Sequence, residues 1–245
     1  MKIALASMPV VNRDVARNLE TILKTISQCA GRAGLILFGE AVLQGFDALT
    51  WEYEADLHIA VSMDDASIRQ VCAAAKAHEI AVSFGYLEKA DGVIFSSQLL
   101  IGGDGRLVHN FRRVSPGWKE PRADAHYAEG SGFLPFSYGG KRLAIGLCGD
   151  LWYPGRAAEM RALDADAVLW PVWCDYAPEQ WNTRIKYEYA EQAALCGKNM
   201  LLVNPVCADP DASPDSAAGG AVCFRNGKIA GELPSGSAGI LYCDC

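Results

Sequence analysis

Three side chains of this sequence are suited to chemistry, and each follows a short apolar run. Cys148 follows Leu143–Leu147, and Glu40 and Arg113 each come after a comparable predicted strand, with one residue between. Ligands of open α/β sheets bind at the carboxyl ends of strands, so polar residues just past such runs are the first candidates for a site. The residue types point to a nucleophilic thiol with a carboxylate to move protons.

Cys148 has two interpretations. A small buried core residue is the usual role of a cysteine in a chain of this kind. Here Gly149–Pro154 follows the predicted strand, which places the thiol at a turn before a predicted helix. Backbone N–H groups at such a turn can stabilise a thiolate and a developing oxyanion, and this favours the functional interpretation.

A nucleophilic cysteine usually needs a base, and histidine is the commonest one. The four histidines, at positions 58, 78, 109 and 126, all precede Cys148. This order excludes papain-like proteases and glutamine amidotransferases of the Cys-His-Glu type. The remaining base is a carboxylate, and Glu40, at a strand end beside apolar residues, is expected to have a raised pKa. A surface carboxylate at a strand-loop junction remains the alternative.

Composition narrows the classes of partner. The chain has 245 residues, 51% of them hydrophobic, and 22 Lys+Arg against 29 Asp+Glu give a net charge of −7. An acidic globular protein has no general field for phosphate backbones, so we expect no nucleic-acid partner. No apolar run approaches the roughly 18–20 residues of a membrane span, and no signal-peptide-like region begins the chain. We therefore expect a cytoplasmic protein without a membrane partner.

Nine cysteines are scattered along the chain, and no two of them form a CxxC pair. This spacing favours neither a zinc ribbon nor a thioredoxin-type redox site. There is no HExxH motif, and the glycine run Gly102–Gly105 lacks the spacing of a phosphate loop. We expect no metal and no cofactor.

Hydrophobic periodicity alternates between strands and helices, which predicts an α/β layered fold. Hairpins such as the one at Gly102–Gly105 make its sheets mixed, and residues 1–245 are expected to form a single domain. Ala208–Gly220 is predicted to be a long surface loop. Strands are predicted at Lys2–Met8, Leu35–Phe38, Ile80–Phe84, Val93–Ile101, Leu107–Phe111, Leu143–Leu147, Ala167–Trp170, Met200–Asn204, Ala221–Arg225, Lys228–Glu232 and Gly239–Cys243. Helices are predicted around Val15–Ile26 and Ile68–Ala75, after Pro154, and at Pro178–Leu195.

Ordered segments of the chain resemble the successive blocks of the nitrilase superfamily of carbon-nitrogen hydrolases. Each block is weak alone, but the ordered set over nearly the whole chain is specific. The resemblance implies a four-layer α-β-β-α sandwich with two mixed sheets, and a homodimer or higher homo-oligomer. The segments are Lys2–Ala6 with Asn18, Leu35–Glu40, Asn110–Arg113, Ile145–Asp150, Leu202–Asn204 and Gly219–Ile229.

The resemblance also implies a Glu-Lys-Cys catalytic triad, commonly with a second glutamate near the lysine. Glu40 matches the general base, Cys148 the nucleophile, and Glu120 the second glutamate. In the family the cysteine attacks an amide or nitrile carbon, the amine leaves, and water aided by the glutamate completes hydrolysis. The lysine stabilises the negative charge of the tetrahedral intermediate.

Arg113 stands where the family has its lysine. Arginine keeps the positive charge and the donors for an oxyanion, but its planar guanidinium is larger than an ammonium. Lys119 is the alternative oxyanion stabiliser, unless it is a solvated lysine on a loop. Gly39 replaces a usual proline, a change expected to alter mainly loop stiffness.

The remaining candidates are substrate-binding residues around the thiol. Trp173 and Cys174 follow a strand and are expected on the same rim as Cys148, and Cys174 is a weaker rival nucleophile. Gly149 adjoins the thiol. Trp118 and Tyr127 are either pocket walls or packing residues.

These observations predict a hydrolase of non-peptide carbon-nitrogen bonds, most simply an amidase or carbamoyl-amidase on a small carboxamide. Because Arg113 replaces the lysine, a non-catalytic small-ligand-binding protein on the same fold is the alternative. Nitrilase activity and acyl transfer to another amine also stay open, and the sequence does not identify the substrate.

Overall fold

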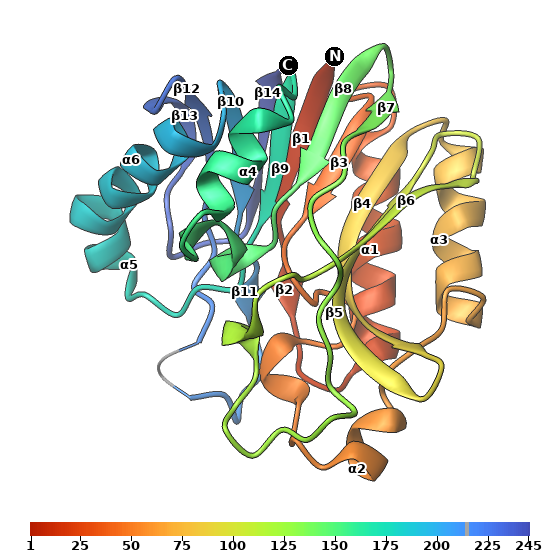
Figure 1. The fold of residues 1–245 in the computed structure, drawn as a ribbon. Helices are drawn as coiled ribbons and strands as arrows, with labels where there is room; N and C mark the ends of the chain where they lie inside the picture. The colour runs from red at the N-terminus through yellow and green to blue at the C-terminus, as the bar shows by residue number, and fades with distance from the viewer. Residues whose placement is uncertain (214–215) are drawn as a thin grey trace.

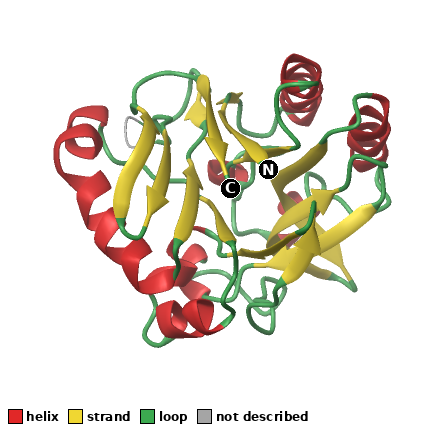
Figure 2. Ribbon diagram, turned by 90° about the horizontal axis from the view of Figure 1, so that it is seen from above, coloured by secondary structure: helices red, strands yellow, loops and turns green. Residues whose placement is uncertain are grey.

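The computed structural model describes residues 1–213 and 216–245, which form four layers. Two six-stranded sheets face each other, and helices cover the outer face of each sheet (Figure 1). Seen from above, the order helix, sheet, sheet, helix is plain (Figure 2). The α-β-β-α sandwich expected from the sequence is therefore confirmed.

The first sheet contains β1 Lys2–Ser7, β3 Leu35–Phe38, β4 Ala81–Ala90, β5 Val93–Ile101, β6 Leu107–Arg112 and β14 Gly239–Asp244. The strands lie in the order β14-β1-β3-β4-β5-β6. β1, β3 and β4 are parallel, whereas β5, β6 and β14 join by antiparallel pairing. The sheet is therefore mixed.

The second sheet repeats this plan. It contains β7 Phe136–Tyr138, β8 Lys141–Ile145, β9 Ala167–Pro171, β10 Asn199–Val203, β12 Ala221–Arg225 and β13 Lys228–Leu233. Its order is β13-β12-β10-β9-β8-β7, with β8, β9 and β10 parallel. A short parallel pair, β2 Pro9–Val10 and β11 Val206–Cys207, lies beside the two sheets.

The helices divide between the two outer faces (Figure 1). α1 and α3 cover the first sheet, and α4 and α6 cover the second. The bounds are α1 Val15–Cys29, α2 Tyr53–Leu57, α3 Ala66–Ala77, α4 Arg156–Ala162, α5 Pro178–Gln180 and α6 Lys186–Cys196. A π-helical turn, Trp181–Ile185, joins α5 to α6, and short 3-10 turns occupy Phe46–Ala48, Pro116–Trp118 and Cys148–Trp152.

Alternation along the strands builds two cores. In β1, Ile3 and Leu5 pack into the core that includes the second sheet, whereas Ala4 and Ala6 belong to the core beneath α1 and α3. Successive strand side chains point to opposite faces, so one strand serves both layers. The site-bearing strand ends are thereby held from both sides.

Most predicted helices and strands are confirmed, and the differences concern their ends and one interruption. β4 continues to Ala90, past the expected end at Phe84, and the helix predicted at Pro178–Leu195 is interrupted by the π-helical turn. Within the predicted loop Ala208–Gly220, residues 214 and 215 lie outside the described residues. In the described part of the chain, no helix has the length and apolarity to cross a bilayer.

Candidate active site

Glu40, Arg113 and Cys148 come from strand ends in both sheets. Glu40 follows β3, Arg113 follows β6, and Cys148 follows β8 after two residues. The Glu40 N–H donates to the carbonyl of Val172, just past β9, over 3.2 Å. The end of β3 is thus tied to the second sheet, and the strand ends of the two sheets meet at one place.

The centre of this place is a buried ion pair. Arg113 Nη1 donates to Glu40 Oε1 over 2.8 Å, and Ser96 Oγ donates to the same oxygen over 3.0 Å. Arg113 Nε lies 3.6 Å from an oxygen of Asp150. All three charged side chains are at most 5% exposed. One guanidinium therefore lies between two buried carboxylates.

Asp150 also fixes the chain that carries Arg113. Its carboxylate accepts hydrogen bonds from the N–H groups of Val114, over 3.2 Å, and Ser115, over 2.9 Å, and from the Ser115 hydroxyl. Charge-assisted bonds of this kind are about twice as strong as neutral ones. Asp150 therefore holds the segment after β6 against the turn that bears Cys148.

Cys148 sits in an unusual backbone conformation. It opens a 3-10 turn with φ at 46°, in the left-handed region that non-glycine residues rarely adopt. Its thiol donates to the carbonyl of Trp173 over 3.6 Å, and the Trp170 indole donates to the Cys148 carbonyl over 3.0 Å. Contacts from the second sheet hold this conformation, as strained functional positions require.

Gly149 makes room for Arg113. A β-carbon at position 149 would lie 2.9 Å from Arg113 Nη2, closer than van der Waals contact permits. Gly39 has a similar role, because a β-carbon there would lie 2.5 Å from Cδ of Pro205. The expectation that Gly39 affects mainly loop stiffness is therefore incomplete: its small size permits close packing against the residues that follow β10.

Burial and neighbouring charges shift the pKa values of the site. Burial raises the pKa of Glu40 to about 8, although Arg113 opposes the shift, and Cys148 lies close enough to add to it. Burial raises the pKa of Asp150 to about 6, again against Arg113. Contact with Cys174 and burial raise the pKa of the Cys148 thiol above its ordinary value. A carboxyl group with a pKa near 8 is suited to accept and donate protons near neutral pH.

Cys174 directly follows Trp173, whose carbonyl accepts the hydrogen bond of the Cys148 thiol. Asn204 binds its backbone on both sides, accepting from the N–H and donating to the carbonyl, each over 2.9 Å. Its sulfur is 3.1 Å from the phenol oxygen of Tyr189 on α6. Trp173 precedes it and is 8% exposed.

Lys119 and Glu120 lie differently from the expected arrangement. Lys119 Nζ is 2.6 Å from Glu129 and donates to the carbonyl of Tyr127 over 3.1 Å. Glu120 is exposed and pairs with Arg122 over 2.9 Å. The backbone at Lys119 is extended, so its neighbour points the other way. Glu129, rather than Glu120, is the carboxylate that the structure pairs with Lys119.

Trp118 and Tyr127 are buried packing residues. They form a cluster with Trp51, with ring centroids 5.2–6.3 Å apart. The Tyr127 hydroxyl donates to buried Asp56 over 2.8 Å. Of the two interpretations offered by the sequence, packing describes these contacts.

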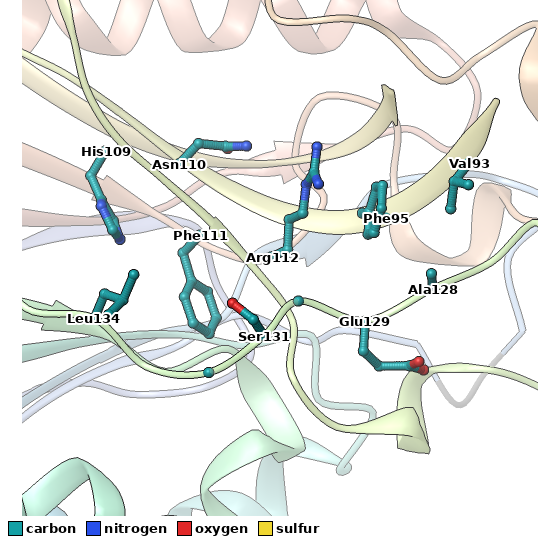
Figure 3. Close-up of a pocket in the computed structure, with 12 residues that line it drawn as sticks. Val93, Phe95, His109, Asn110, Phe111, Arg112, Ala128, Glu129, Ser131 and Leu134 are labelled. Atoms are coloured by element: carbon teal, nitrogen blue, oxygen red, sulfur yellow. The ribbon is translucent and has the colours of Figure 1, made fainter. Parts of the chain in front are cut away.

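A separate groove of about 500 Å³ lies along β5 and β6 (Figure 3). It is lined by Phe95, Arg112 and Glu129 among others, and by none of the three central residues. Arg112 is engaged there by buried Glu88, over 2.7 Å. Nothing in the described residues gathers three or more metal-ligating side chains of the His, Cys, Asp or Glu type.

Sequence reasoning missed Ser96, Glu129 and Tyr189, and it gave Asp150 no role. The first three lie in the middle of elements or in a loop, where the chain shows no strand-end signal. Asp150 could have been predicted from the sequence, because a carboxylate two residues after a candidate nucleophile lies in the same turn.

Comparisons with known proteins agree with this fold. A family model described as carbon-nitrogen hydrolase matches residues 2–245. An (R)-stereoselective amidase of Pseudomonas sp is 26% identical over 170 residues, which is 69% of this chain and 59% of that protein. An aliphatic nitrilase of Rhodococcus rhodochrous is 28% identical over 143 residues, or 54% of this chain and 38% of that protein. The matches thus span less than two thirds of these curated relatives.

Among solved structures, the NitN amidase from Neterenkonia sp. AN1 superposes with a TM-score of 0.79 at 19% identity, over 100% of this chain and 92% of that one. A variant of the amidase from Nesterenkonia sp. AN1, with a TM-score of 0.77 at 18% identity over 100% of this chain and 93% of that one, shows Michael addition of acrylamide at its active-site cysteine. The shared fold and a family match over residues 2–245 lead to one conclusion: the chain belongs to the carbon-nitrogen hydrolase family.

Proposed function

We propose that this protein is an amidase that hydrolyses small carboxamides through a thioester on Cys148. The observation that carries the proposal is the convergence of Glu40, Arg113 and Cys148 from strand ends of both sheets, with Glu40 and Arg113 in direct contact. The similarity to amidases supports an amide as the substrate.

Glu40 acts as the proton carrier. Its carboxylate takes the proton of the Cys148 thiol as the sulfur attacks the amide carbon, and then gives that proton to the departing amine. Water, deprotonated by the same carboxylate, attacks the thioester and releases the acid and the thiol. A pKa near 8 suits a group that both accepts and donates protons near neutral pH.

Arg113 stabilises the tetrahedral oxyanion. A guanidinium has five N–H donors, and one of them is bound to Glu40, so donors remain for the developing charge. Oxyanion donors of this kind contribute about 10²–10³ in kcat. Lys119 is engaged by Glu129 and Tyr127, which favours Arg113 for this role.

A panel of small carboxamides, carbamoyl compounds and nitriles, assayed by ammonia release, tests the proposal. Carboxamides are expected to release ammonia faster than nitriles. Faster turnover of nitriles would replace the amidase assignment with a nitrilase one. A hydroxamate formed with added hydroxylamine would reveal acyl transfer from the thioester.

The alternative is a small-ligand-binding protein, favoured by one observation. Arg113 holds the Glu40 carboxylate in a buried ion pair, and a carboxylate bound in this way is less available to accept a proton. Saturable binding of a carboxamide by calorimetry, without ammonia release at any pH, would support this alternative against the amidase.

We also propose that the chain assembles as a homodimer or higher homo-oligomer, as the family resemblance implies. Light scattering at several concentrations tests this, and a monomeric mass at all of them would contradict it. A cytoplasmic location stays a prediction from the sequence.

A further inference from the structure

Cys148 has a second thiol beside it that the proposed reaction does not use. The Cys148 thiol donates over 3.6 Å to the carbonyl of Trp173, the residue directly before Cys174, and Cys174 is the largest cause of the raised pKa of Cys148. Cys174 is buried, at 6% exposure. Two thiols therefore lie side by side, and one of them is the proposed nucleophile.

Cys174 lies against Tyr189 in a segment between two elements. Its sulfur lies 3.1 Å from the phenol oxygen of Tyr189, whose pKa is raised by burial, so the phenol stays protonated and able to donate. Cys174 lies in Trp173–Ala177, between β9 and α5, a segment without helix or strand in which a side chain can turn toward Cys148.

We propose that Cys148 and Cys174 form a dithiol that closes to an intramolecular disulfide when a hydroperoxide oxidises Cys148. The disulfide blocks the nucleophile, and thiol reductants restore it. Formation of the bond does not depend on the proposed amidase function; only its effect on turnover does.

The chemistry balances in two steps. Glu40 takes the Cys148 proton, the sulfur attacks one peroxide oxygen, the O–O bond breaks, and the leaving oxygen takes a proton to give an alcohol or water. Cys148 is now a sulfenic acid. The Cys174 sulfur then attacks the Cys148 sulfur, the S–O bond breaks, and the leaving hydroxide takes the Cys174 thiol proton and departs as water. The sum is two thiols plus a hydroperoxide giving one disulfide, an alcohol or water, and water.

Tryptic peptides make the bond directly observable. Cys148 is the only cysteine of Leu143–Arg156, and Cys174 is the only cysteine of Ala162–Arg184. After treatment with equimolar hydrogen peroxide, mass spectrometry is expected to find these two peptides joined, and dithiothreitol is expected to separate them. Cys72→Ser, on α3 across the first sheet, is the matched control and should leave the link unchanged.

Cys174→Ser should abolish the link and let Cys148 proceed to the sulfinic acid, which dithiothreitol does not reduce. In wild-type protein, Cys148 found unmodified or as sulfinic acid, with no joined peptide, would overturn the proposal. Because the peptide readout needs no turnover, a linked protein without amidase activity would count against the proposed function alone.

Discussion

At Glu40, burial and a neighbouring arginine act in opposite directions. Burial favours the neutral acid, whereas Arg113 favours the carboxylate, and the balance leaves a pKa of about 8. The position of Glu40 at a strand end predicted a raised pKa, and both that position and the family resemblance made Glu40 the candidate base. The ion pair with Arg113 was not foreseen, because pairing across 73 positions leaves no local signal.

The pKa of Glu40 predicts the pH dependence of turnover. The base must be deprotonated, so kcat/KM should fall as pH falls below about 8 and rise toward a plateau above it. A pH profile of kcat/KM checks this. Glu188→Gln, at an exposed pair with Arg184, is the control and should keep the profile. A flat profile from about pH 6 to pH 9 would contradict Glu40 as the base.

Arg113 should be needed for its charge. Arg113→Met is expected to lower kcat/KM by about 10²–10³, since an oxyanion donor is lost. It should also shift the acidic limb of the profile to higher pH, because Arg113 lowers the pKa of Glu40. Arg113→Lys should retain more activity than Arg113→Met. Equal activity of Arg113→Met and wild type would exclude the arginine from the reaction.

Gly149 and Arg113 should be coupled. Gly149→Ala places a β-carbon against the guanidinium and is expected to lower kcat/KM in wild type. In an Arg113→Lys background the smaller ammonium leaves space, so the same substitution should cost less. A double-mutant cycle measures the difference. Strictly additive effects would show that the glycine serves another purpose.

The strand ends are positioned by close contacts between elements, and Gly39 is one of them. Gly39→Ala puts a β-carbon 2.5 Å from Pro205 and should destabilise the protein by about 1–3 kcal/mol, as overpacking does. Urea unfolding measures this. Gly231→Ala on β13, whose β-carbon would meet only Leu241 at 3.8 Å, is the matched control. Equal unfolding midpoints for the two variants would contradict the close-packing account.

Elements with apolar periodicity were predictable, and those with buried polar residues were less so. The prediction ended β4 at Phe84, before Gly85 and Glu88, yet the strand continues and the Glu88 carboxylate is buried in it, bound by Arg112 and Ser97. The short strands β2, β7 and β11 have two or three residues each, too few for a period to show. Whether such short segments form strands depends on their pairing with distant parts of the chain.

For the whole molecule, the layer order followed from the resemblance, and the alternation of strands and helices agreed with it. The contacts between loop residues could not be predicted from the sequence, because contacts between the two sheets join positions that are far apart in the chain. Lys119 illustrates this: its sequence neighbour Glu120 is in solvent, while Glu129 supplies its ion pair.

Ammonia release by Cys148→Ala tests the central claim most directly. On any carboxamide that the wild type hydrolyses, the variant should lose essentially all turnover, because no thioester can form. Cys196→Ala, which removes a buried thiol on α6, serves as the control and should keep turnover in folded protein. Wild-type rates in folded Cys148→Ala would contradict the account.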